Sequence, residues 1–95
     1  MNTLNQLTPQ EQRIIEIISS HFGLDKENVT PASDLVDDLN LQPLELVDLT
    51  ETLNQKLDIN LDTAEASQWK TILDIVHSVM ENGDPIKIQA NQVNE

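Results

Sequence analysis

The chain has 95 residues, with 17 Asp or Glu against five Lys or Arg, and a formal net charge of −12 at pH 7. Such a surface repels nucleic acids and anionic membranes, so we exclude both as partners. It favours protein partners with basic patches. Alternatively, the charge only keeps the domain soluble. The absence of cysteine excludes disulfides, thiolate metal sites and thiol nucleophiles, and the length predicts one small domain, which we expect to be monomeric.

Residues 1–7 contain neither a basic segment nor a long apolar run, so they do not look like a signal peptide. Nor does any apolar stretch approach the roughly 20 residues of a membrane span. We therefore expect a cytoplasmic protein, with an N-terminal extension over 1–7, a helical domain over 8–83 and a flexible tail over 84–95.

The first helix is predicted to start after Thr8, with Pro9 in its first turn and Glu11 completing a capping box. Apolar residues then recur at helical spacing, and Gly23 is a typical helix end. The expected buried stripe is Ile14, Ile15, Ile18 and Phe22.

Residues 24–41 show no long periodicity and contain turn-forming residues, which predicts a loop. Its apolar residues are too numerous to be left in water, so we expect it to be pinned over the core, with a short helical turn near 33–37. A connection of this length is unusual in a compact domain.

A second helix is predicted from about Pro43 to about Leu57, since proline suits the first helical position. One side of this helix is an apolar stripe formed by Leu46, Leu49, Leu53 and Leu57. The opposite side is acidic and carries Glu45, Asp48 and Glu51.

Beyond it, Asp62 and Glu65 predict a short helix over about 63–67. The last helix should begin near Thr71, capped by Asp74, and end at Gly83 and Pro85; its apolar positions are Ile72, Ile75, Val76, Val79 and Met80. The expected fold is all-α, without strands.

The segment Asp38-Leu39-Asn40-Leu41-Gln42-Pro43-Leu44-Glu45 resembles the Asp-Leu-Gly-x-Asp-Ser-Leu-(Asp/Glu) signature of acyl and peptidyl carrier proteins. The resemblance extends from about Glu11 to Val79. It implies a carrier-protein-like four-helix bundle of three longer helices, one short helix and a long first loop. Pro43 replaces the family's serine, which bears phosphopantetheine, and Gln42 replaces an aspartate that helps the modifying enzyme hold its metal.

Proline has no hydroxyl for the phosphodiester that holds the arm. Thr50 lies about 10 Å further along the helix, at roughly 1.5 Å per residue, and Ser33 lies in the loop before it. We therefore expect no 4'-phosphopantetheine, no other cofactor and no metal site. Nor do we expect an enzyme, because His21 and His77 have no evident nucleophile beside them.

The resemblance also implies a channel for an acyl chain, lined here by Leu53, Leu57, Leu61, Trp69 and Ile75. Trp69 and Ile75 are larger than the family's usual residues, so we expect the channel to be closed. The simpler interpretation is that Trp69 is merely a core anchor or is half exposed.

At the start of the second helix, Leu44, Glu45, Asp48 and Glu51 form the expected partner-binding surface, although an acidic stripe is also typical of a merely solvated face. Candidate partners have basic patches, and include acyl-chain-processing enzymes or a true carrier.

Two hypotheses follow. The first is a non-carrying, carrier-like protein that acts as an interaction, regulatory or scaffolding module linked to fatty-acid, polyketide or peptide synthesis. The second is a working acyl or peptidyl carrier. They differ at Pro43.

Overall fold

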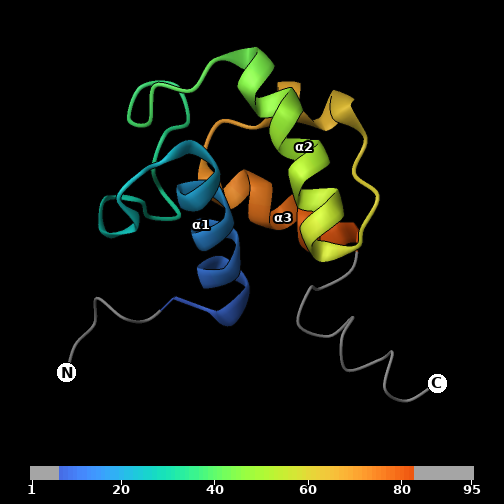
Figure 1. Ribbon diagram of the computed structural model, residues 1–95, viewed down its shortest axis with the longest axis horizontal. Helices are drawn as coiled ribbons and strands as arrows, with labels where there is room; N and C mark the ends of the chain where they lie inside the picture. Colours follow the sequence, from blue (N-terminus) through green and yellow to red (C-terminus); the bar gives the residue numbers. More distant parts are fainter. Residues whose placement is uncertain (1–6, 83–95) are drawn as a thin grey trace.

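The computed structural model describes residues 7–82, and these form three α-helices and two short 3-10 helices (Figure 1). In chain order the elements are α1 (Pro9–Phe22), η2 (Lys26–Asn28), α2 (Pro43–Leu57), η3 (Thr63–Gln68) and α3 (Ile72–Asn82). Within 7–82 the only β pairing is an isolated bridge between Asp34 and Thr71. This confirms the all-α, carrier-like bundle, in which η3 is the short helix; η2 was not predicted.

The start of α1 follows from local sequence alone. The Thr8 side chain accepts a hydrogen bond from the Glu11 N–H, and the Glu11 carboxylate accepts one from the Thr8 N–H, each at 3.0 Å. At the other end, Gly23 has a φ of 68°, a left-handed conformation that suits glycine at a helix end. Both predicted boundaries of α1 are confirmed.

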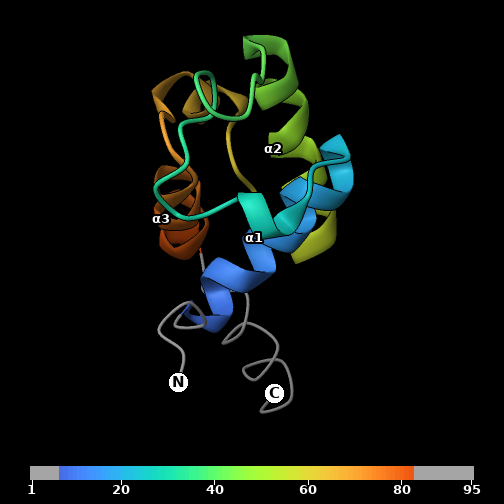
Figure 2. The same cartoon turned by 90° about the vertical axis from the view of Figure 1, so that its left-hand side faces the viewer.

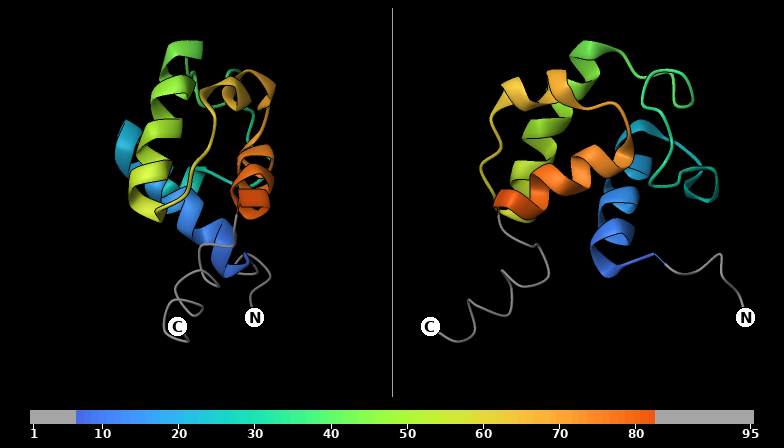
Figure 3. Two further views of the ribbon diagram at one scale, coloured as in Figure 1. Left: turned by 90° about the vertical axis from the view of Figure 1, so that its right-hand side faces the viewer. Right: turned by 180° about the vertical axis from the view of Figure 1, so that it is seen from behind.

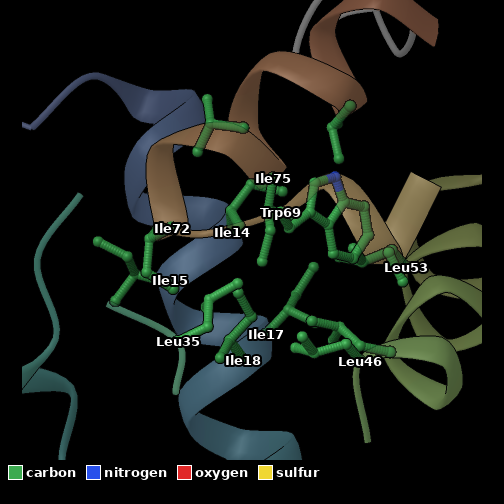
Figure 4. Packing of buried hydrophobic residues seen from close by; sticks show 14 of the residues in the cluster. Ile14, Ile15, Ile17, Ile18, Leu35, Leu46, Leu53, Trp69, Ile72 and Ile75 are labelled. Carbon is green, nitrogen blue, oxygen red and sulfur yellow. The ribbon is translucent and has the colours of Figure 1, made fainter. Parts of the chain in front are cut away.

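The core lies where α1 packs against α3 and α2 packs against η3 (Figure 2). The predicted stripe of α2 is buried throughout. The buried side of α1 differs from the prediction, because Ile17 is also buried and Phe22 is only partly buried. In α3, Met80 was predicted to be buried but is 42% exposed. Figure 4 shows the converging side chains, which include Ile14, Ile18, Leu35, Leu53, Ile72 and Ile75.

The long loop packs on the core, as predicted, with Val29, Leu35 and Leu41 buried there. Backbone hydrogen bonds also hold it to the start of α3, which was not predicted. The Leu35 N–H donates to the Lys70 carbonyl at 2.9 Å, and the Ile72 N–H donates to the Ser33 carbonyl at 3.2 Å. The side chain of Asp34 holds a turn by accepting from two backbone N–H groups, and it also pairs with Lys70 at 2.8 Å. Beyond these bonds the loop leads into the first turn of α2. This turn lies at the end of the molecule where η3 also lies (Figure 3).

The predicted cap of α3 is present, since the Asp74 carboxylate accepts from the N–H groups of Lys70 at 2.8 Å and Thr71 at 3.0 Å. These bonds lower the pKa of Asp74. The expected stop signals at Gly83 and Pro85, the tail over 84–95 and nearly all of the extension over 1–7 lie outside the described residues.

Candidate functional site

No side chain in the first turn of α2, or in the residue before it, carries a hydroxyl group. Pro43 occupies the first helical position and is exposed, as is Gln42 before it. The Gln42 N–H donates to the Glu45 carboxylate at 2.7 Å, so an otherwise unpaired N–H of the helix end is satisfied. Glu45 therefore has a structural role that the sequence analysis did not assign to it.

Asn40, two residues before this helix boundary, has a φ of 58°. Asparagine tolerates the left-handed region better than most residues because its short polar side chain bonds locally. The carrier signature has glycine here, which adopts the same conformation freely. Asparagine can therefore take this left-handed position in place of glycine.

The hydroxyls near Pro43 differ in access. Thr50 is fully buried and donates to the Val47 carbonyl at 2.6 Å. Ser33 is also buried, and its oxygen accepts from the Thr30 N–H at 2.9 Å. Ser67 of η3 is exposed and donates to the Ala64 carbonyl at 2.9 Å, but it does not belong to α2. Neither hydroxyl weighed in the sequence analysis is accessible.

A groove of about 260 Å³ opens beside Pro43, between the first half of α2, the loop before it and η3. Its floor includes three buried residues, Leu46, Ala66 and Trp69. Its remaining lining consists of Val36, Pro43, Val47, Thr63 and Ser67. The sequence did not predict this groove, because residues from three separated segments form it.

Trp69 is 7% exposed, and its indole N–H donates to the Ser78 hydroxyl at 2.8 Å. Ile75 is fully buried. Both residues occupy the interior, which fits the expected closed channel and equally fits the simpler interpretation of Trp69 as a core anchor.

The four residues predicted to bind partners stand in different environments. Leu44 is 80% exposed and Glu51 is exposed with no hydrogen bond to its carboxylate among the described residues. Glu45 is half-buried by its capping role, and the Asp48 carboxylate lies 2.9 Å from the His21 ring. Two of the three acidic groups are thus already engaged within the chain.

Comparison with known proteins matches residues 12–79 to the family model described as "Phosphopantetheine attachment site". The acyl carrier protein of Syntrophobacter fumaroxidans is 33% identical over 70 residues, which cover 74% of this chain and 86% of that protein. The acyl carrier protein of Coprothermobacter proteolyticus is 34% identical over 71 residues, covering 75% and 87%. The chain belongs to the carrier-protein family.

Carrier proteins of this family hold 4'-phosphopantetheine on a serine, and the residues at the corresponding position here do not fit that group. Pro43 offers no oxygen for a phosphodiester, and Gln42 offers no carboxylate beside it. The side chains of Pro43 and Gln42 therefore do not fit a phosphopantetheine arm at the start of α2.

Two further observations concern residues 7–82. None of their helices is long and apolar enough to cross a membrane. Their His, Asp and Glu side chains form no cluster of three that could hold a metal ion.

Proposed function

We propose that this carrier-family protein carries no phosphopantetheine and acts as a protein-interaction module, regulating or scaffolding partners in fatty-acid, polyketide or peptide synthesis. The observation that supports this most is Pro43, an exposed proline at the first position of α2 where the family has its modified serine. The two hydroxyls considered from the sequence, those of Thr50 and Ser33, are both buried.

The proposed docking surface is the first half of α2, with Leu44 as its apolar contact and Glu51 as its free carboxylate. An exposed leucine beside carboxylates suits a partner with a basic patch around an apolar contact. Acyl-chain-processing enzymes and true carriers are the partners that family membership suggests.

The absence of the arm is tested with a broad-specificity phosphopantetheinyl transferase and coenzyme A, followed by intact-mass measurement. We expect no modification of the native chain. The double variant Pro43→Ser with Gln42→Asp is the positive control, and its modification would show that the enzyme still recognises the scaffold.

Modification of the native chain would instead favour the working-carrier hypothesis. Ser67→Ala and Thr63→Ala would then tell whether an exposed hydroxyl of η3 had accepted the group.

The docking surface is tested by capture of partners from the native cell with Glu51→Lys. Glu16→Lys is the matched control, because it makes the same charge reversal at an exposed position of α1. We expect Glu51→Lys alone to lose the partners. Equal capture by both variants would place the interaction elsewhere.

A further inference from the structure

A pocket of about 300 Å³ lies beside the last turns of α1, where the chain turns into η2 (Figure 1). Three residues of α1 line it, namely Glu16, Ser19 and Ser20, and Leu24 and Lys26 complete the lining. None of these residues belongs to the docking surface proposed on α2. The pocket is therefore a separate feature, which the proposed function does not use.

The backbone after α1 brings the two sides of this pocket together. Gly23 has a left-handed φ of 68°, which turns the chain at the end of the helix. The Leu24 N–H then donates to the Ser19 carbonyl at 2.8 Å. The Asp25 side chain caps η2, whose first residue is Lys26. Local hydrogen bonds thus fix the segment that faces α1 across the pocket.

Ser19 is the first sign that this pocket has a ligand. The residue is 5% exposed, and its hydroxyl is the only buried side-chain polar group without a hydrogen-bond partner among residues 7–82. A buried hydroxyl without a partner destabilises a fold, and such groups are rare in native proteins. Because Ser19 forms part of the wall, a polar group of a ligand seated against that wall can supply the missing partner.

The second sign is a pair of opposite charges that do not neutralise each other. Glu16 and Lys26 are both exposed and line the same pocket. In the described part of the chain, neither side chain takes part in an ion pair or a hydrogen bond. The pocket therefore presents one free carboxylate and one free ammonium group, beside the buried hydroxyl of Ser19.

Size and charge together select the class of ligand. A volume of about 300 Å³ is at the lower end of the range of about 300–1,000 Å³ for small-molecule sites. A simple anion would be repelled by Glu16, and a simple cation by Lys26. A ligand with one charge of each sign pairs with both residues. Leu24, the one apolar residue of the lining, favours a ligand that also has an apolar group.

We propose that this pocket binds a free α-amino acid with an apolar side chain. The ammonium group of the ligand pairs with Glu16. Its carboxylate pairs with Lys26 and accepts a hydrogen bond from the Ser19 hydroxyl, and its side chain lies against Leu24. This site goes beyond the docking function proposed above, and neither depends on the other.

A titration of the isotope-labelled full chain, followed by the amide signals in NMR spectra, tests the proposal. The ligands are L-leucine, N-acetyl-leucine, which has no ammonium group, and isopentylamine, which has no carboxylate. All three have the same branched apolar group. We expect leucine to shift the amide signals of the lining residues to saturation, and to bind at least about tenfold more tightly than either analogue, because charge-assisted hydrogen bonds are the stronger ones.

Ser19→Ala is the first test variant, and it should weaken leucine binding about tenfold. The ligand-free variant should be more stable than the native chain in urea, because the unpartnered hydroxyl is gone. A loss of binding with a gain of stability cannot come from unfolding.

Lys26→Gln is the second test variant. It should bind leucine no more tightly than isopentylamine, because the partner of the ligand carboxylate has been removed. Lys56→Gln, which makes the same change of charge at an exposed position of α2, is the matched control and should leave the preference for leucine intact.

Three results would overturn the proposal. One is equal affinity for the three ligands, and another is the absence of a saturable shift at the lining residues. The third is tighter binding of isopentylamine than of leucine, which would make the pocket a cation site at Glu16 alone. Partner capture with Glu51→Lys judges the docking function separately.

Discussion

His21 Nε2 lies 2.9 Å from Asp48 Oδ2, which joins the last turn of α1 to the middle of α2. The two side chains are 27% and 60% exposed. Asp48 belongs to the surface proposed for partner binding, so a cationic group on a partner would compete with His21 for the same carboxylate. The pair thus couples the packing of two helices to the proposed interface.

From this pair we predict that His21→Ala lowers the free energy of unfolding by only about 0.2–1 kcal/mol, as is usual for polar contacts between exposed side chains. The same variant should bind a basic partner more tightly, because Asp48 is released. Urea unfolding gives the first quantity, and titration with a lysine-rich peptide gives the second. Asp48→Ala added to His21→Ala should remove the gain in binding; a gain that persists would assign it to another group.

The second prediction concerns acid stability. Backbone hydrogen bonding from Asp37, followed by the hydrogen bond from Lys70, lowers the pKa of Asp34 to about 2 from an ordinary value of 3.8. Because the folded-state pKa is depressed, this stabilisation is present above about pH 4 and is lost as the pH falls towards 2. Asp34→Asn should therefore lower the melting temperature at pH 7 and reduce its further loss between pH 4 and pH 2.

Lys70→Gln separates the two causes of that shift. The hydrogen bond from the Asp37 N–H is the larger cause. Lys70→Gln should therefore reduce the loss of melting temperature between pH 4 and pH 2 less than Asp34→Asn does. In the alkaline range the sign reverses, because the hydrogen bond to Asp34 raises the pKa of Lys70 above 10.5. Its stabilisation is full below pH 10.5 and is lost as the pH rises beyond that value. If the melting temperatures of the two variants changed equally between pH 4 and pH 2, the backbone hydrogen bond would not be the larger cause.

A third prediction follows from Ser19, whose hydroxyl is buried in α1 with no hydrogen-bond partner. An unsatisfied buried hydroxyl costs about 1–3 kcal/mol, and alanine also has the better helix propensity. Ser19→Ala should therefore raise the free energy of unfolding by about 1 kcal/mol in urea titration. Ser20→Ala, at the exposed neighbouring position, reports the propensity gain alone, and an equal effect of the two would show that the Ser19 hydroxyl carries no penalty.

The ends of α1 and α2 provide a fourth, paired prediction. Asp58 ends α2 with a φ of 55°, where a side chain is unfavourable, whereas Gly23 ends α1 with a φ of 68°. Asp58→Gly should stabilise the protein by about 0.5 kcal/mol, and Gly23→Ala should destabilise it by about 1 kcal/mol. A Cβ on Gly23 would meet no atom within 4 Å, so its cost is purely conformational. Thermal unfolding should show shifts of opposite sign, and shifts of the same sign would refute the conformational explanation.

The sequence predicted the features that local residues determine. The capping box of Thr8 and Glu11 spans one turn, and the apolar stripe of α2 repeats within one helix, so both could be read from spacing. The pairs His21–Asp48 and Asp34–Lys70 join residues 27 and 36 positions apart. Such contacts depend on how the elements pack, which no local pattern encodes.

The candidate site divides in the same way. Pro43 and its missing hydroxyl were evident from the signature segment, and the position at the helix start followed from proline's fixed φ. The capping role of Glu45 is local, and an acidic residue at the third helical position was a usable signal for it. The groove was not predictable, because Val36, Val47 and Ala66 come together only in the folded chain.

Pro43 also bears on how such a protein could arise. At the first position of a helix the backbone N–H needs no partner within the helix, so proline is accepted there without loss of stability. An ancestral serine at this position could be replaced while the fold stayed intact, and selection for folding would not have opposed the change. The same tolerance works in reverse, so restoring the serine leaves the helix undisturbed. At the first position of α2, a change between serine and proline therefore need not disturb the fold.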